Sequence, residues 1–320
     1  MAIVGGNNGT QTETSDYLVP YGILKRADVA DVVALATSEG PVKLYPALNV
    51  LPQDTVVRFD EYHPQGADYV IVPAMSRDND PEVLRWLQQQ AAKGAIIIGI
   101  CAGAKVVAAA GLLENKRATT HWYYVKQLRE RYPSIHYVAD RRFVSDGRIV
   151  TTTGITASIP TMLTLIEAIA GRDKAASVAR ELGGESWDAR HSSAAFAFTR
   201  PFALTLLMNK HASWRHEKLG IEIDNGVDEV SLALVTDAWS RTYRSRALTI
   251  GRSPGTIETR SGLKILPDFF SGEALPEQRL PAIGAAAPAL ALDAALTAIE
   301  TRYGEATAKL VAMQLEYPRD

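Results

Sequence analysis

The chemistry of this 320-residue chain centres on its single cysteine, Cys101, which lies within the pentapeptide Gly99-Ile100-Cys101-Ala102-Gly103. The pentapeptide follows an apolar run, Ala95–Ile100, and opens a helical run, Ala104–Ala110. A strand, a sharp turn and a helix form the context of a nucleophile elbow, in which small neighbours permit a strained backbone at the nucleophile. Free N–H groups at the start of the helix favour the thiolate, so we expect a lowered cysteine pKa. The alternative is a buried structural cysteine. The complete motif favours a nucleophile or a redox-reactive thiol.

A histidine follows the elbow helix in a short polar stretch. With an ordinary pKa of about 6.5, the imidazole of His121 could take the thiol proton or orient a substrate. A structural histidine with satisfied hydrogen bonds is the alternative. The other histidines lie in loops, at the surface or between the two halves of the chain, and their spacing gives no metal site: His63, His136, His191, His211 and His216. We therefore expect no metal.

Short apolar runs alternate with helical patterns through the first half of the chain. Near-continuous runs such as Tyr69–Pro73 are typical of strands covered on both faces. Strand–helix alternation predicts a parallel sheet between two layers of helices, over residues 1–190. The expected strands and helices are Ile3–Val4, Leu18–Lys25, Asp31–Ala36, Val42–Leu44, Leu48–Val50, Pro81–Ala92, Ala95–Ile100, Arg148–Thr152 and Ile159–Ala170.

The second half, residues 191–320, resembles a shortened copy of the first. An offset of 215 residues aligns five identical pairs without a gap: Ser38 with Ser253, Gly40 with Gly255, Leu48 with Leu263, Leu51 with Leu266 and Pro52 with Pro267. Residues 163–167 align with 296–300 at an offset of 133, so the copy would lack about 82 residues. The missing segment holds the counterparts of Cys101 and His121. A generic α/β extension with similar turn chemistry is the alternative.

Composition narrows the function classes. The chain has 34 basic and 36 acidic residues and no long basic run, which argues against direct nucleic-acid binding. No apolar run reaches the ~20 residues of a membrane helix, so no membrane partner is expected. A single cysteine excludes an internal disulfide framework. The first residues lack a secretory signal, so we expect a cytoplasmic protein. Because the chain starts almost inside its first strand, a leader removed from the natural protein stays open.

Residues 2–185 resemble the DJ-1/PfpI superfamily, which is related to class I glutamine amidotransferases. The resemblance is carried by the elbow and by four further stretches: Gly111-Leu112-Leu113, residues 117–122 (RATTHW), residues 141–148 (RRFVSDGR) and residues 151–154 (TTTG). The Thr-Thr-His-Trp form is most similar to isocyanide hydratases and to the amidotransferase-like sensor domains of AraC-type regulators. The resemblance implies a flavodoxin-like, doubly wound, mostly parallel sheet, to which the degenerate α/β copy is added. It implies no cofactor.

The resemblance also implies roles for individual residues. It places His121 beside Cys101 and sets a carboxylate from the first turn of the first helix against the sulfur. Asp16 matches that position best, where it could share a proton with the sulfur or act as a general acid and base. Glu13 is the second candidate for this position. Alternatively, Glu13 is only a negative charge at the start of the helix, where it interacts favourably with the helix dipole.

The backbone around the elbow is expected to hold negative charge that develops on a substrate. The main-chain N–H groups of Ala102 and Met75 would do so, with Ala74 and Gly103 as neighbours, and Trp122 would form an aromatic wall. Many relatives carry Pro-Gly-Gly where this chain has Pro73-Ala74-Met75, so the pocket is narrower here. Protease-like members carry histidine at the position of Ala102, which argues against a peptidase.

Three functions remain open. The first is an enzyme that hydrolyses or hydrates a small carbon–nitrogen or carbonyl compound, as an amidase, isocyanide hydratase or glyoxalase-like enzyme. The second is a sensor of a small molecule or of redox state, and the third is a stress or scaffold protein with an oxidisable cysteine. AraC-type regulators carry a helix-turn-helix module downstream, whereas residues 191–320 show strand-like runs and no two-helix basic module. We expect the second half to pack on the first as an intramolecular pseudo-partner, with a homodimer through another surface left open.

Overall fold

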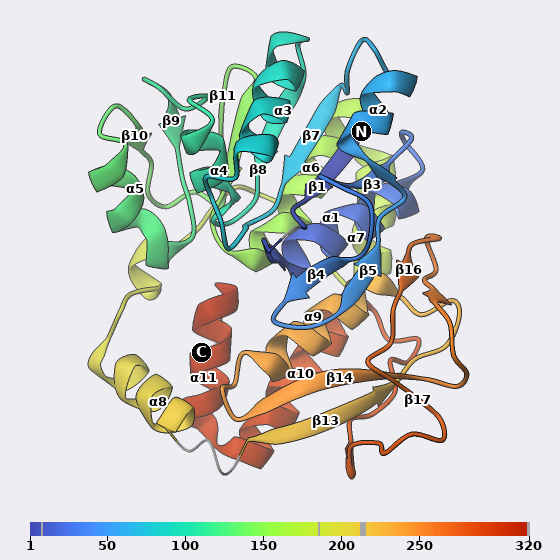
Figure 1. Ribbon diagram of the computed structural model, residues 1–320. Helices are drawn as coiled ribbons and strands as arrows, with labels where there is room; N and C mark the ends of the chain where they lie inside the picture. The colour runs from blue at the N-terminus through green and yellow to red at the C-terminus, as the bar shows by residue number, and fades with distance from the viewer. Residues whose placement is uncertain (8, 185, 212–215, 319–320) are drawn as a thin grey trace.

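The structure is a computed structural model that describes residues 1–7, 9–184, 186–211 and 216–318 (Figure 1). A seven-stranded sheet in the order β11-β12-β8-β7-β1-β3-β6 forms the centre of the first half. Its neighbouring strands are parallel except for the β11–β12 hairpin. The strands are β1 (Ala2–Gly5), β3 (Val33–Ala36), β6 (Asp54–Thr55), β7 (Tyr69–Val72), β8 (Ile96–Gly99), β11 (Phe143–Asp146) and β12 (Ile149–Thr152). The expected mostly parallel α/β sheet is thus confirmed.

Helices cover both faces of this sheet. Successive residues of a strand point to opposite faces: the side chain of Ile3 packs in one core, and those of Ala2 and Val4 pack in the other. The first core contains residues of α1 (Thr14–Ala27), α6 (Ser158–Ala170) and α7 (Arg172–Leu182). The second contains residues of α2 (Val56–Tyr62), α3 (Pro81–Ala92), α4 (Gly103–Ala109) and α5 (Val125–Arg131). The long Val/Ile runs follow from this double burial.

The second half of the chain lies below the first in Figure 1, coloured from yellow to red. Its parallel four-stranded sheet has the order β17-β14-β13-β18. Helix α9 packs against α1 of the first half and against α10. The elements are α8 (Arg200–His211), β13 (Glu217–Glu222), α9 (Glu229–Ser240), β14 (Ser245–Gly251), β17 (Phe269–Phe270), β18 (Gln278–Arg279), α10 (Pro288–Tyr303) and α11 (Glu305–Leu315).

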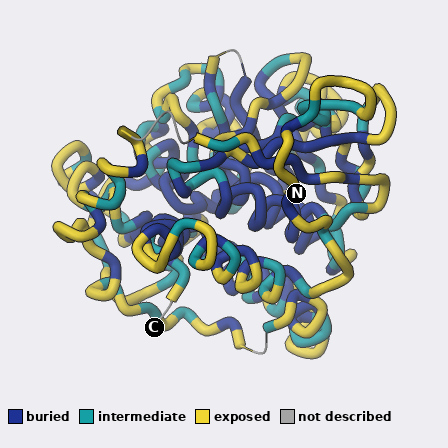
Figure 2. Tube along the Cα trace, turned by 90° about the horizontal axis from the view of Figure 1, so that it is seen from below, coloured by how far each residue is buried: buried dark blue, intermediate teal, exposed yellow. Residues whose placement is uncertain are grey.

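A third sheet joins the two halves. Its order is β15-β16-β5-β4-β2, formed by β2 (Thr12–Glu13), β4 (Val42–Tyr45), β5 (Asn49–Leu51), β15 (Ile257–Glu258) and β16 (Lys264–Ile265). Strands β5 and β16 run antiparallel, with Val50 opposite Ile265. The junction buries a continuous core, and Figure 2 shows the buried residues in the interior with exposed loops around the periphery. The remaining short elements are β9 (Arg117–Ala118), β10 (His136–Tyr137), η1 (Trp122–Tyr124), η2 (Ile155–Ala157) and η3 (Ser193–Ala195).

Two ion pairs bridge α1 and α9 in reciprocal fashion. The Arg26 guanidinium lies 2.5 Å from Asp228, the N-cap residue of α9. The Arg241 guanidinium lies 2.7 Å from Glu13, the N-cap residue of α1. Arg26 lies in the last turn of α1 and Arg241 directly follows α9, so each arginine binds the start of the other helix.

The halves also correspond element by element at the offsets found in the sequence. At 215 residues, β1, α1, β3, β4 and β5 fall on β13, α9, β14, β15 and β16. The left-handed residue after the first helix, Asp28, falls on Tyr243, which has the same conformation. At 133 residues, α6 and α7 fall on α10 and α11.

None of the described helices combines the length and apolar character needed to cross a membrane.

Candidate active site

Cys101 lies in a strained turn between β8 and α4. Its φ angle is +54°, a region that non-glycine residues rarely adopt. The turn is held on both sides, because the Cys101 N–H donates to Thr152 Oγ1 at 2.9 Å and the Thr120 hydroxyl donates to the Cys101 carbonyl at 3.0 Å. Glycine is required at Gly103, where a Cβ atom would stand 2.0 Å from the Val72 carbonyl oxygen. The small residues of the motif therefore serve close backbone packing.

Asp16, on the first turn of α1, is fully buried close to the cysteine. One carboxylate oxygen, Oδ2, accepts a hydrogen bond from the Ala74 N–H at 3.0 Å. The other oxygen, Oδ1, has no hydrogen-bond partner among the described residues. Burial raises the pKa of Asp16 to about 7, although the bond from Ala74 works against the rise. This carboxyl group can therefore gain and lose a proton near neutral pH.

Glu13 belongs to the same buried group but is bound on both oxygens. Its Oε2 caps α1 by accepting the Asp16 N–H at 2.5 Å, and its Oε1 accepts from Arg241 at 2.7 Å. Arg241 also binds Asp237 at 2.5 Å. Burial, and then the charges of Asp237 and Asp16, raise the pKa of Glu13 well above its ordinary value, while Arg241 opposes the rise. Of the two carboxyl groups weighed from the sequence, Asp16 keeps the free oxygen.

The pKa of Cys101 moves in the opposite direction from the one that the sequence led us to expect. Burial raises the pKa of the thiol well above its ordinary value, and the charges of Asp16, Glu13 and Glu316 raise it further. The Ala102 N–H lowers the pKa by a hydrogen bond to the sulfur, but this effect is smaller. Loss of solvation and nearby carboxylates outweigh the N–H groups of a seven-residue helix. The resting cysteine is therefore a thiol.

His121 is buried and lines the same cavity as Cys101. Its Nε2 lies 2.9 Å from the Gln314 carbonyl, and its Nδ1 accepts the Tyr123 N–H at 3.2 Å. Because a carbonyl only accepts, the proton of the neutral ring sits on Nε2. Burial lowers the pKa of His121, which favours this neutral form. Both ring nitrogens are thus engaged with the main chain, and a role in taking the thiol proton stays a prediction.

The four backbone positions suggested for charge stabilisation differ in how their N–H groups are used. Ala102 directs its N–H toward the Cys101 sulfur. Ala74 donates to Asp16, and Gly103 donates to the Ile100 carbonyl at 2.6 Å. Met75 pairs with Thr12 in an isolated bridge. The two hydrogen bonds of that bridge come from residues 13 and 76, so neither uses the Met75 N–H. Of the four N–H groups, that of Ala102 faces the sulfur, and that of Met75 takes no part in the bridge to Thr12.

The cysteine opens into a cavity of about 400 Å³ whose wall comes from both halves of the chain. The first half contributes the elbow and an aromatic side that includes Trp122. The second half contributes six residues that no sequence motif marks: Phe202, Leu206 and Lys210 from α8, Arg241 and Tyr243 after α9, and Gln314 from α11. The only sequence signal for any of them is the offset of 215 residues, which places Arg241 at the counterpart of Arg26.

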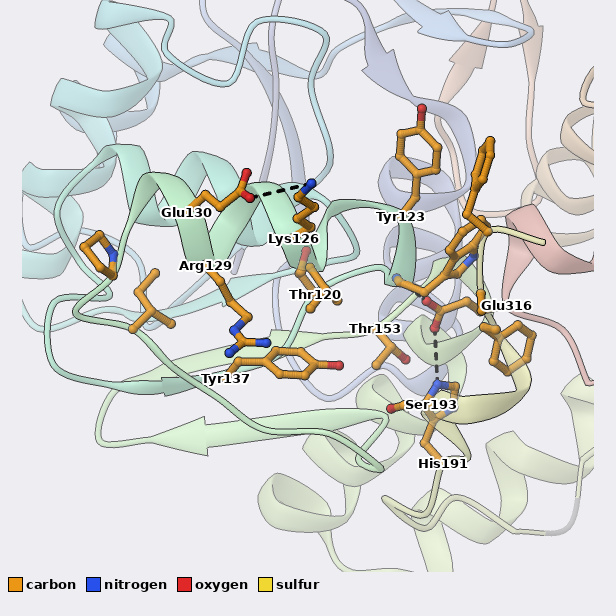
Figure 3. A pocket seen from close by; sticks show the side chains of 17 residues that line it. Thr120, Tyr123, Lys126, Arg129, Glu130, Tyr137, Thr153, His191, Ser193 and Glu316 are labelled. Carbon is orange, nitrogen blue, oxygen red and sulfur yellow. Dashed lines mark hydrogen bonds and ion pairs between the residues drawn. The ribbon is translucent and has the colours of Figure 1, made fainter. Parts of the chain in front are cut away.

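A larger cavity of about 1070 Å³ lies beside α5 and β10, against residues 191–198 (Figure 3). In Figure 3 the side chains of His191 and Glu316 face each other, with 3.6 Å between Nε2 and Oε2. Glu316 also accepts the N–H groups of Trp122 and Gly154, at 2.6 and 2.7 Å. Neither Cys101 nor Asp16 lines this space. It therefore lies outside the group of residues suited to nucleophilic chemistry.

Comparison with known proteins adds the family to this geometry. Residues 8–168, which make up half of the chain, match the model of the DJ-1/PfpI family. The chain belongs to the DJ-1/PfpI family. Cys101, Asp16 and His121 all fall within the matched segment, whereas the second half of the cavity wall falls outside it.

Relatives of this DJ-1/PfpI chain include enzymes and regulators. An isonitrile hydratase from Pseudomonas putida is 38% identical over 104 residues, which cover 32% of this chain and 44% of that protein. The HTH-type transcriptional regulator CdhR from Pseudomonas aeruginosa is 38% identical over 101 residues, covering 32% and 30%. The matched segments thus span less than half of either relative. The Parkinson disease protein 7 homolog of Danio rerio is 27% identical over 173 residues, covering 52% and 88%.

Solved structures share the fold of the family domain. Drosophila melanogaster DJ-1beta superposes with a TM-score of 0.51 at 23% identity, covering 58% of this chain and 97% of that chain. Such a match concerns the fold alone. Among the described residues, no group of three histidine, cysteine or acidic side chains is placed to hold a metal ion.

Proposed function

We propose that Cys101 is the nucleophile of an enzyme that hydrolyses or hydrates a small carbon–nitrogen or carbonyl compound. One observation carries the proposal: a strained cysteine faces a cavity of about 400 Å³ beside a buried carboxyl group with a free oxygen. The raised Asp16 pKa of about 7 suits proton transfer at neutral pH. Similarity to an isonitrile hydratase supports this class of reaction.

The proposed reaction is written for an amide substrate. Asp16 as a carboxylate takes the thiol proton, and the sulfur bonds to the carbonyl carbon while the π electron pair moves to oxygen. The N–H groups of Ala102 and Met75 stabilise that oxygen. The carbonyl re-forms as the carbon–nitrogen bond breaks, and Asp16 passes its proton to the departing amine. Water then attacks the thioester and gives a proton to Asp16, which returns it to the departing sulfur.

We also propose that residues 191–320 are a shortened, degenerate copy of the domain in residues 1–190. Support comes from the element correspondence at two offsets, the matched left-handed residues and the reciprocal arginine pairs between α1 and α9. The copy carries Ser231 at the counterpart of Asp16 and has no cysteine. In this proposal it serves as a fused, chemically inert partner that closes one wall of the cavity.

The pH dependence of Cys101 alkylation tests the proposed nucleophile, and intact mass reports it without ambiguity because the chain has one cysteine. We expect Cys101 in the folded protein to react with iodoacetamide at alkaline pH. Replacing Asp16 by Asn should lower the apparent thiol pKa, because it removes a carboxylate charge that raises this pKa. The same change should abolish turnover of amide or isonitrile substrates, because no group then carries the proton.

The matched control for Asp16→Asn is Asp60→Asn, which removes a carboxylate from a partly exposed site beside Lys93. It should change neither the alkylation profile nor turnover. A cysteine that stays unreactive until the protein unfolds would overturn the proposal.

A second candidate function is a small-molecule sensor. The observation that favours it is the 38% identity over 101 residues to a transcriptional regulator. Saturable ligand binding in the Cys101 cavity, with no product formed by the wild-type protein, would favour a sensor over an enzyme.

A further inference from the structure

The charged residues around the Cys101 cavity have an uneven distribution. Three basic side chains line it, those of Lys105, Lys210 and Arg241, against a single acidic one, Glu13. Arg241 is already committed, because it binds both Glu13 and Asp237. The two lysines are therefore the remaining source of positive charge that could interact with a bound molecule.

Of the three cavity cations, Lys210 has no acidic partner among the residues that the structure describes. Its ammonium nitrogen lies 4.7 Å from the centre of the Tyr243 ring. No carboxylate oxygen lies within the 4.0 Å of an ion pair in the part of the chain that the structure describes, although many other lysines and arginines have such a partner. An aromatic ring attracts a cation but, unlike a carboxylate, does not neutralise its charge. Lys210 can thus bind an anion without breaking an ion pair.

Lys105, on the first turn of α4, adds to this charge. Its ammonium group lies 2.9 Å from Asp78 and 4.5 Å from the centre of the Tyr124 ring. Asp78 is shared with Arg131, at 3.3 Å. One carboxylate therefore faces two cations, and this cluster carries a net positive charge.

Phenol groups accompany the lysines in the cavity wall. Tyr45, Tyr124 and Tyr243 all line the cavity. Burial raises the pKa of Tyr243 to about 12, and a hydrogen bond with Tyr45 contributes to the rise, so the phenol keeps its proton. Cations and phenol donors together form the kind of surface that binds a carboxylate.

Carboxyl groups lie near the sulfur: Glu13 lines the cavity, and Asp16 is buried close to Cys101. The cavity thus has carboxyl groups near the sulfur and lysines on α4 and α8. We infer that the substrate is a small carboxylate-bearing molecule, whose carboxylate binds at Lys210 and the phenols while its electrophilic carbon faces the sulfur. This inference rests on the proposed role of Cys101 as nucleophile, and the volume of about 400 Å³ sets the size.

Two alkylating reagents of nearly the same size test this inference. In both, the sulfur bonds to the methylene carbon and iodide leaves with the bonding pair, but iodoacetate carries a carboxylate where iodoacetamide carries a neutral amide. The measurement is the ratio of their rate constants at Cys101, with the urea-unfolded protein as the reference for an unstructured thiol. We expect the folded protein to favour iodoacetate relative to that reference, and added salt to reduce the preference.

Substitution at Lys210 locates the effect. Lys210→Gln should lower the ratio about three- to tenfold, the size expected for one charge partly screened by solvent. Lys210→Arg should restore it. The matched control is Lys126→Gln, because Lys126 is exposed, pairs with Glu130 and lines the other cavity. It should leave the ratio unchanged.

The outcomes separate this inference from the proposed function. Suppose that both reagents alkylate Cys101 in the folded protein, but Lys210→Gln does not change the ratio of their rate constants. This result would overturn the carboxylate specificity and remain compatible with Cys101 as the nucleophile. Failure of both reagents to modify the folded protein would overturn the nucleophile and the inference with it.

Discussion

Asp16 connects protonation to stability at the scale of single residues. Its carboxyl group is fully buried, and its pKa rises from an ordinary 3.8 to about 7. A carboxyl pKa that is higher in the folded state means that folding favours the protonated form. The folded protein therefore binds more protons than the unfolded chain between these two values, and the free energy of unfolding falls as pH rises through that window. The position thus lowers stability at neutral pH, a cost that the proposed role of Asp16 in proton transfer would explain.

Replacement of Asp16 by Asn tests this cost. We expect the unfolding free energy of the variant to fall less than that of wild type as pH rises from 4 to 7. At about 1.4 kcal/mol for each pKa unit, the variant should gain up to roughly 4 kcal/mol of unfolding free energy relative to wild type by pH 8. Urea unfolding at pH 4.5 and pH 8 measures the difference. An equal change in unfolding free energy at both pH values would show that the Asp16 carboxyl is not perturbed.

The strand–turn–helix unit around Cys101 sets the site at the scale of elements. β8 supplies a buried strand end, α4 begins directly after the turn, and the Thr120 and Thr152 side chains fix the Cys101 main chain. Space for this turn depends on Gly103, which approaches the end of β7 more closely than any side chain could.

Gly103→Ala tests that close approach. The new Cβ atom would meet the Val72 carbonyl at 2.0 Å, so α4 must move away from β7. We expect a loss of roughly 2–4 kcal/mol of unfolding free energy and a changed alkylation rate at Cys101. Gly184→Ala is the control, because the nearest atom to its added Cβ lies 3.9 Å away. Similar stability for the two variants would contradict the packing argument.

The contact between the two halves acts at the scale of the whole molecule. Helices α1 and α9 exchange reciprocal ion pairs, and one of them brings Arg241 against the carboxyl groups behind Cys101. The second half therefore contributes packing contacts and charge to the site, although it contains no cysteine. Glu316 makes a further link, because it binds the backbone next to His121.

Arg241→Met should destabilise the protein strongly. It leaves the buried carboxylates of Glu13 and Asp237 without their cation, a loss of about 3–5 kcal/mol for a broken buried pair. Arg26→Met is the matched control and should have the smaller effect, because Asp228 keeps Arg260 at 3.9 Å. Urea unfolding at pH 7 measures both variants. Equal losses of unfolding free energy in the two variants would contradict this prediction, because they would show that Arg241 contributes no more to stability than Arg26.

Local signals in the sequence were sufficient for most strands of the central sheet, for helices such as α3 and α6, and for the elbow, but they did not reveal α2, α5, α7, α8 or α11. The proline and the apolar spacing of Pro81–Ala92 match α3 residue for residue, because helix period and capping depend on neighbours in the chain. The runs around Tyr69 and Ile97 match β7 and β8 because strands buried on both faces must be apolar throughout. The G-x-C-x-G pattern likewise predicts the tight turn, because only small residues fit its close backbone packing.

Tertiary structure alone decided the electrostatics and the walls of the site. The sequence led to a lowered Cys101 pKa, whereas burial and distant carboxylates raise it. The engagement of both His121 nitrogens depends on Gln314, and the charge of the cavity depends on Lys210, each brought in from the second half. Desolvation and Coulomb interactions depend on distance in space rather than on separation along the chain. Only the folded arrangement of both halves could therefore set them.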